Sequence, residues 1–327
     1  MNLVEICDDI NTILKKYNVD ISITPQMIDV SSNGLLSFEK IGDCPFKKNF
    51  YFNNTAKLVD VYAYKSAQRA IDMLSNDVLY FTSLEKNEDN DYSEYSEFFH
   101  RVGFFEPFIP NGYVKGKTLL YQSKLPIDFD RENTYIYCLT NTFNKTRHWK
   151  EYANFAMGVC IEYSFEFKAR LNQCIDFNYG RIVYDTGYLY DYLKEINWML
   201  RRKYQLSFCP TGLRRFAAMY KREKYSWEDE SRIVLFGKNP SEKNESTGSK
   251  LIDDCNSFFG GNPLKEERLL TKENGFQIIK PGVLQAQNNN ILFKWNVERV
   301  VAGERIHPND LSQLVTICNK RNIKLYP

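Results

Sequence analysis

Apolar residues repeat at two spacings along this chain, one typical of helices and one typical of strands. Helical spacing over 2–17 and over 187–206 predicts two amphipathic helices. Another helix is expected to follow Ser66, which can cap it, and to end near 76–77. Further helices are expected over 148–155, 211–222 and 309–321.

Short runs rich in β-branched and aromatic residues predict the strands. In chain order they cover 21–24, 35–38, 50–52, 58–65, 78–83, 134–140, 157–163, 180–184, 233–236, 276–279, 291–295, 300–302 and 323–326. The polar stretch 84–97 is expected to be an acidic surface loop. This mixture predicts an α+β fold with a mixed or split β-sheet core flanked by helices. Residues 1–56 are expected to form an N-terminal extension, and 57–327 the main domain.

Composition and charge narrow the class of protein. The 327 residues include 43 basic and 41 acidic side chains, so the net charge of +2 excludes a polybasic coat but allows a local basic groove. Eight cysteines without a C-x-x-C pair favour free thiols over a disulfide framework or a zinc site. The sequence begins without a signal-peptide pattern, and no apolar run approaches the ~18–20 residues of a membrane span. We therefore expect a cytoplasmic protein with no membrane contact.

The candidate chemistry is concentrated in Glu228-Asp229-Glu230, which is followed by Arg232 and an apolar run. Neighbouring carboxylates repel each other, and this raises the pKa of at least one if they are partly buried. On a strand, Glu228 and Glu230 would point to one face, beside an arginine. The alternative is a solvated acidic turn that leads into a strand.

Two further features each allow a structural and a functional interpretation. Trp149 and Tyr152 share a helix face, which indicates either core packing or a wall on which a flat ring can stack. Basic residues gather at 201–203, 214–215 and 221–224. They suit nucleic-acid phosphates, although the helix dipole suffices to explain the first group. The stretch 111–118 is a near miss to a phosphate-binding loop and is read as chance.

Taken together, several of these motifs resemble a widespread bacterial domain family of unknown function. The resemblance covers roughly 57–327. It rests on Tyr64-Lys65 and on Phe81-Thr82-Ser83. It rests also on a W-x-x-Y-A helix, here Trp149, Tyr152 and Ala153, followed by G-V-C-I-E at 158–162. The last motif is a late E-x-E-x-R, formed here by Glu228, Glu230 and Arg232. Tyr225 stands where that family usually has Trp, and the loop after Ser83 lacks its Asn-Asp-Pro turn.

The layout of these motifs is in turn similar to that of ADP-ribosyltransferases. The resemblance implies that Glu230 stabilises positive charge on a ribose and that Glu228 orients or deprotonates the acceptor. It implies that NAD, the substrate, is held by a set of residues that line one cleft with Glu230, and it requires no metal. That set is Tyr64, Lys65, Thr82, Ser83, Trp149 and Tyr152, with Arg232 keeping the turn rigid by pairing with Glu228 or Glu162.

The function implied is mono-ADP-ribosylation of a macromolecule, RNA, DNA or protein, by a bacterial toxin or anti-phage effector. An antitoxin or inhibitor protein is a possible partner. Two other classes stay open. One is a non-catalytic domain that binds a nucleotide or protein, and the other is a metal-dependent nuclease.

Overall fold

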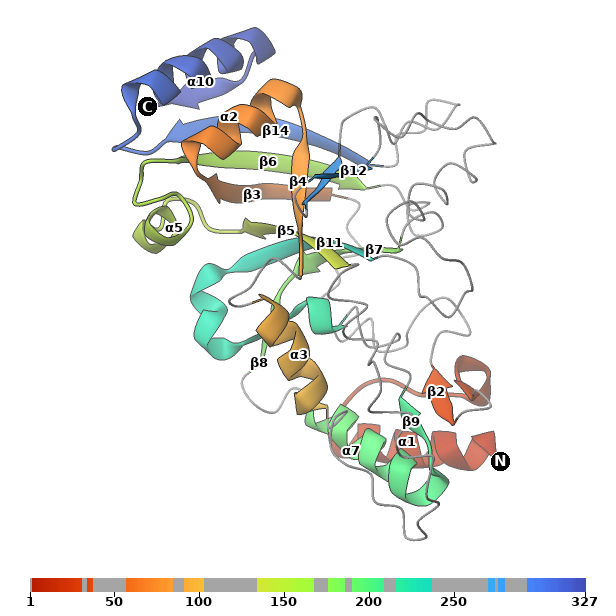
Figure 1. Ribbon diagram of the computed structural model, residues 1–327. Coiled ribbons are helices and arrows are strands. Elements are labelled where there is room, and N and C mark those ends of the chain that lie inside the picture. The colour runs from red at the N-terminus through yellow and green to blue at the C-terminus, as the bar shows by residue number, and fades with distance from the viewer. Residues whose placement is uncertain are drawn as a thin grey trace, which may run out of the picture. The chain divides into compact units, whose positions relative to one another are not determined.

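The computed structural model describes 2–30, 34–37, 57–84, 91–102, 134–167, 176–185, 190–208, 216–236, 270–273, 276–279 and 293–327 (Figure 1). The chain divides into two compact units, each assembled from several segments. Unit 1 comprises Met1–Phe52, Asn87–Glu132 and Ile182–Ser226. Unit 2 comprises Asn53–Lys86, Asn133–Arg181 and Trp227–Pro327. These boundaries differ from the division at residue 57 expected from the sequence.

Unit 1 is built from helices and very short strands. Its helices are α1 (Leu3–Lys16), α3 (Asp91–Arg101) and α7 (Asp191–Met199), with the π-helical turn η5 (Leu200–Tyr204) and the 3₁₀ turn η1 (Pro25–Met27). Strands β1 (Asp29–Val30), β2 (Leu35–Ser37) and β9 (Ser207–Phe208) pair with one another. Strands β8 (Val183–Asp185) and β10 (Tyr220–Arg222) pair in parallel. The 3₁₀ turn η6 (Glu223–Glu228) then leads into unit 2.

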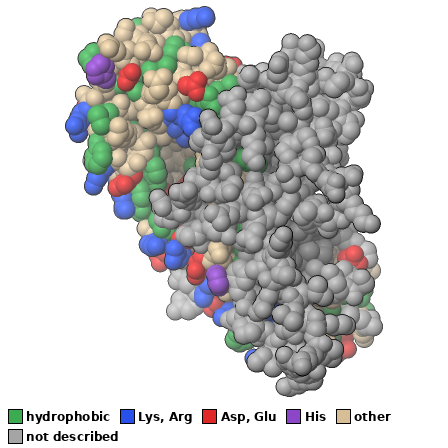
Figure 2. All heavy atoms as spheres, in the orientation of Figure 1, with side chains coloured by type: hydrophobic (Ala, Val, Ile, Leu, Met, Phe, Trp, Pro, Cys, Tyr) green, Lys and Arg blue, Asp and Glu red, His purple; other side chains and the backbone are tan. Residues whose placement is uncertain are grey.

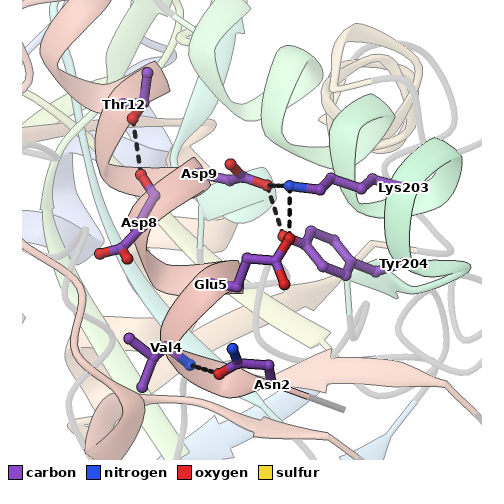
Figure 3. A network of polar contacts seen from close by, with 8 residues as sticks. All are labelled: Asn2, Val4, Glu5, Asp8, Asp9, Thr12, Lys203 and Tyr204. Atoms are coloured by element: carbon purple, nitrogen blue, oxygen red, sulfur yellow. Dashed lines mark hydrogen bonds and ion pairs between the residues drawn. The ribbon is translucent and has the colours of Figure 1, made fainter.

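Helix α1 is held to the segment α7–η5 by an apolar stripe and by ion pairs at its border. The stripe buries Ile6, Ile10 and Leu14, which confirms the helical spacing read over 2–17. Lys203 Nζ lies 2.7 Å from Asp9 Oδ2 and 2.9 Å from Glu5 Oε1 (Figure 3). Because these charges are solvent-exposed, the apolar stripe contributes most of the stability of this contact.

Unit 2 contains one large sheet flanked by helices, so the structure confirms a mixed α+β architecture. Among the described residues its ten strands run in the order β12-β13-β4-β5-β3-β6-β14-β15, with β11 and β7 continuing from β5. All pairs are antiparallel except β14 with β15, which makes the sheet mixed. The strands are β3 (Lys57–Lys65), β4 (Leu79–Ser83), β5 (Thr134–Thr140), β6 (Val159–Phe167), β7 (Asp176–Arg181), β11 (Glu230–Phe236), β12 (Leu270–Glu273), β13 (Phe276–Ile279), β14 (Phe293–Ala302) and β15 (Lys324–Tyr326).

The sheet forks at β5. One edge of β5 pairs with β11 along its whole length. On the other edge, Tyr135 and Ile136 pair with β4, whereas Thr140 pairs with Tyr62 of β3. Strands β3 and β4 therefore leave the same edge of β5 as separate branches. The residues Glu228-Asp229-Glu230, which we call the acidic turn, lie at the β3 end of the fork.

The two faces of this sheet have different coverings. Helices α2 (Ala67–Asn76) and α10 (Pro308–Arg321) lie over one face, and their apolar residues join the main core (Figure 1). The short helix α5 (Thr146–Glu151) and the turn after it cover part of the other face, where Trp149 and Ala153 pack against Tyr62 and Tyr64. Ser66 caps α2 by accepting a hydrogen bond from Arg69 N, as predicted.

Sequence predictions are wrong at three segments within the described residues, and the expected strand 180–184 is divided between β7 and β8. Tyr220–Arg222, expected to be helical, is a strand because it pairs with β8, and this pairing overrides local propensity. The expected acidic loop 84–97 overlaps α3, whose Tyr95, Phe98 and Phe99 are buried at helical spacing. Residues 21–24 are not a strand. The expected strand 50–52 and the stretch 111–118 lie outside the described residues.

A left-handed turn after α5 is held by close backbone contacts. Asn154, Phe155 and Ala156 have φ values of 48°, 55° and 64°, a conformation that costs roughly 1–2 kcal/mol per residue. Ala156 N donates to Trp149 O at 3.1 Å, and Gly158 N donates to Ala153 O at 2.9 Å. These backbone hydrogen bonds fix the turn in spite of its strain.

Gly158 should tolerate no side chain, because a Cβ there would lie 2.1 Å from Lys65 O. We expect Gly158→Ala to lower the free energy of unfolding by roughly 1–3 kcal/mol or more, since backbone must shift. Ala156→Gly is the matched opposite change, and it should stabilise because glycine adopts positive φ without strain. Denaturant titrations measure both. A neutral Gly158→Ala would contradict this packing.

Candidate functional site

The acidic turn is anchored to the residues that follow β5. Thr140 Oγ1 donates to Glu228 O at 2.8 Å. The backbone N and the side-chain Nδ2 of Asn141 donate to Asp229 O at 2.8 and 2.7 Å. The Thr142 hydroxyl donates to the Asp229 carboxylate, and Asp229 itself has a φ of 45°. The turn is therefore fixed on both sides of its central residue.

Glu230 and Arg232 form a buried ion pair on one face of β11. Arg232 Nε lies 2.7 Å from Glu230 Oε1, and Nη2 lies 3.3 Å from Oε2. The two residues are only 4% and 1% exposed. Two residues apart on a strand, they share a face, and the guanidinium fork matches the carboxylate. Each charge is thus compensated out of water by the other.

Glu228 has a different kind of partner. Its Oε1 accepts a hydrogen bond of 2.9 Å from the Tyr152 hydroxyl, while its backbone O lies 3.2 Å from His148 Nε2. Glu228 is 6% exposed, but Tyr152 is 46% exposed. Tyr152 therefore links a buried carboxylate directly to the surface of unit 2.

A cluster of aromatic rings borders this turn. Tyr64 stacks on His148 at 5.3 Å and meets Trp149 edge-on at 5.0 Å between ring centroids. Trp227 lies 5.5 Å from His148 and stacks on Tyr152 at 6.1 Å. We call these five residues the aromatic cluster. It supplies flat faces beside the Glu228 carboxylate, which Tyr152 contacts directly.

Burial sets the protonation of two residues in the aromatic cluster. It raises the pKa of Tyr64, whose hydroxyl accepts a 2.8 Å bond from Asn144 N, so Tyr64 is a neutral phenol. Burial lowers the pKa of His148 despite the hydrogen bond to Glu228 O. Since a carbonyl only accepts, neutral His148 carries its proton on Nε2. Its buried Nδ1 then has no hydrogen-bond partner among the described atoms.

The structure brings most of the predicted site residues together, but Lys65 lies elsewhere. Tyr64, Trp149, Tyr152 and Glu228 are linked through His148, whereas Glu230 and Arg232 pair with each other on the strand that follows. Lys65, next to Tyr64 on β3, points to the opposite face, where its Nζ lies 5.0 Å from the Tyr137 ring centroid. Burial lowers its pKa. The expectation that Lys65 shares one cleft with Glu230 is therefore revised.

The remaining predicted residues occupy other positions. Thr82 and Ser83 lie in β4 on the other branch of the fork, paired with Ile136 and Tyr135. Arg232 pairs with Glu230, whereas Glu162 pairs with Arg299. Arg232 was expected to pair with Glu228 or Glu162, but in the structure it pairs with Glu230.

Sequence reasoning missed Trp227, the tautomer of His148 and the anchoring role of 140–142. A signal was present in Thr140-Asn141-Thr142, because hydroxyl and amide side chains directly after a buried strand suit the capping of a turn. No comparable signal joined these residues to Glu228, which lies 88 positions away from Thr140.

Comparisons with protein-family models, with curated proteins and with solved structures each found no match. In the part of the chain that the structure describes, no group of three or more His, Cys, Asp or Glu side chains is placed to hold a metal ion. Over the same residues, every helix is too short or too polar to cross a bilayer.

A separate groove of about 700 Å³ lies within unit 1, between α1 and α7. Its lining includes Ile13, Tyr17, Trp198, Met199 and Arg202. It shares no residue with the acidic turn, and the sequence did not indicate it.

Because the ion pair is buried, its loss should change the free energy of unfolding far more than the loss of an exposed acid would. Arg232→Met should cost roughly 3–5 kcal/mol of unfolding free energy, because it leaves a buried carboxylate uncompensated. The double change Glu230→Met with Arg232→Met should cost much less than the sum of the single changes. Lys16→Met, at the exposed pair with Glu195, is the control and should cost about 0–1 kcal/mol. Additive losses in the double variant would contradict the buried pair.

His148 should make the protein acid-sensitive. Its folded pKa lies below the unfolded value of about 6.5, so the unfolded state binds the proton more readily. Its contribution to stability is present above that pH and is lost as pH falls toward the folded pKa, at up to about 1.4 kcal/mol per pH unit. Denaturant titrations between pH 8 and 5 measure this slope. His148→Gln should flatten it, and an unchanged slope in that variant would overturn the assignment.

Proposed function

We propose that unit 2 is an NAD-consuming mono-ADP-ribosyltransferase that acts at the acidic turn. The observation that carries the proposal is the arrangement of Glu228 and Glu230, two fixed carboxylates two residues apart, of which Glu228 contacts the aromatic cluster. Their side chains are held by Tyr152 and Arg232, and the backbone between them is held by Asn141. Such fixed charges need no reorganisation during a reaction.

In the proposed reaction positive charge develops on the ribose, and the proposal assigns the balancing negative charge to the carboxylates of the acidic turn. The bond between ribose C1′ and the nicotinamide nitrogen breaks, and both of its electrons go to the pyridinium ring, which leaves as neutral nicotinamide. The ribose passes through an oxocarbenium-like state, as in glycoside hydrolysis. An acceptor nucleophile then bonds to C1′ and loses a proton. Glu230 is assigned the electrostatic role and Glu228 the proton, in line with the resemblance to ADP-ribosyltransferases.

The side chains around the carboxylates have roles that fit this reaction. Trp149, Tyr152 and Tyr64 supply ring faces against which the nicotinamide or adenine ring can pack. Arg232 holds the Glu230 carboxylate in position through two hydrogen bonds. Lys65, Thr82 and Ser83 are left without an assigned contact to NAD in this proposal, because β3 and β4 place them away from the aromatic cluster. The biological setting we propose is that of a bacterial toxin or anti-phage effector in the cytoplasm.

The direct test is nicotinamide release from NAD by the full chain, with and without a chelator. We expect release that the chelator does not abolish, whereas a nuclease would require a divalent metal and a binding domain would release nothing. The double variant Glu230→Met with Arg232→Met separates chemistry from folding. It should remain folded and lose roughly 10²–10³-fold in rate. Full activity in that variant would remove Glu230 from the mechanism.

Glu228→Gln tests the division of labour between the acids. Gln can still accept from Tyr152 but cannot take a proton, so transfer to an acceptor should fall more than cleavage of NAD by water. The measurement is the ratio of the two rates. Glu298→Gln, an exposed acid on β14, is the matched control and should leave the ratio unchanged. An equal loss of both rates in Glu228→Gln would argue against its role on the acceptor side.

A further inference from the structure

Around Tyr152, unit 2 presents aromatic side chains interleaved with cations. Tyr152 and Phe155 are both exposed, at 46% and 53%, and Trp227 is half-buried. The Arg147 guanidinium lies 3.7 Å from the centroid of the Trp227 ring, and Lys150 Nζ lies 5.9 Å from that of Phe155. We call these five residues the stacking surface.

Charge on this surface is mainly positive. Lys145, Arg147 and Lys150 are exposed on or beside α5, with Glu151 the exposed acid among them. Over the described part of the face drawn in Figure 2, basic, acidic and apolar side chains are interspersed. The protein as a whole is nearly neutral. The cations of the stacking surface are therefore a local feature of α5.

The backbone holds the exposed aromatic ring in place. Phe155 is the middle residue of the left-handed turn, and its N donates to Lys150 O at 3.3 Å. Arg305 N donates to Ala156 O at 3.0 Å and ties the turn to the end of β14. Strained backbone of this kind persists where the surroundings fix it, and it often serves a binding site. A fixed exposed ring loses little conformational entropy when a ligand stacks on it.

We propose that the stacking surface binds single-stranded nucleic acid and that the acceptor of the transferred ADP-ribose is a nucleic acid. This inference rests on the proposed function, because Tyr152 connects the surface to Glu228. Aromatic faces suit unpaired bases of any sequence, and the arginine and lysines suit the phosphates between them. A duplex hides its base faces, so it offers this surface only phosphates.

Phe155 and Arg147 test the surface without touching the carboxylates. Binding of a fluorescein-labelled twelve-nucleotide single-stranded RNA to the full chain is followed by fluorescence anisotropy at several salt concentrations. Phe155→Ala should weaken binding about tenfold or more through the lost stacking. Arg147→Gln should weaken it and reduce the slope of log affinity against log salt by about 0.7, the value for one phosphate of a single strand.

Matched controls come from the edge of the sheet. Tyr326→Ala and Lys324→Gln remove an exposed ring and an exposed cation of β15, and both should bind RNA like the parent. Circular dichroism verifies folding of each variant, and a duplex of the same sequence should bind less tightly. Unchanged affinity in both test variants would overturn the proposal. Equal competition by polyglutamate would also overturn it, by indicating an acidic protein partner.

Failure of the proposed function is distinguishable from failure of this inference. RNA binding that depends on Phe155 together with no nicotinamide release would retain the surface and reject nucleic acid as an ADP-ribose acceptor. Nicotinamide release with no RNA binding would retain the enzyme and reject the surface. Phe155→Ala should leave NAD cleavage by water unchanged, because Phe155 makes no contact with either glutamate in the described structure, and should reduce transfer to RNA.

Discussion

The site depends on a buried charge pair whose two partners lie on the same strand. Arg232 and Glu230 are close in sequence, so their pairing costs little chain entropy, but both lose water when the sheet closes over them. That loss is balanced only if the two side chains keep their relative geometry. Disorder in the acidic turn would separate the two charges while both stayed buried, and this would be unfavourable. The turn is therefore held rigid. The hydrogen bonds from residues 140–142, at the end of β5, help to maintain the same geometry.

The pattern of apolar residues was sufficient to predict most of the sheet. Strands β5 and β13 begin and end where the sequence indicated, because short runs rich in β-branched and aromatic residues favour strands there. The error over 220–222 has a tertiary cause, since a strand that pairs with β8 carries no mark of that partner in its own sequence. The helix α3 was missed because its polar face dominates the composition of 91–101, although its aromatic residues recur at helical spacing.

The candidate site was predictable in its residue types and only partly in its geometry. The sequence indicated Glu228, Trp149 and Tyr152, which the structure connects through Tyr64 and His148. It also indicated Glu230, whose carboxylate pairs with Arg232. The placement of Lys65 beside Tyr64 in one site conflicted with the alternation of side chains along a strand, a rule available from the sequence alone. Burial of Glu230 was not predictable, because it depends on how the sheet pairs and on what covers that face.

The fork at β5 has a consequence for how the protein is made. Ser231 and Asn141, whose side chains join the two halves of the site, are 90 positions apart in the chain. A ribosome must therefore complete β11, which ends at Phe236, before the turn can be anchored. Pairings across such long loops close slowly compared with local ones. A nascent or truncated chain that ends before η6 contains the aromatic residues of α5 but neither glutamate, so the candidate site cannot assemble until the polypeptide extends through β11.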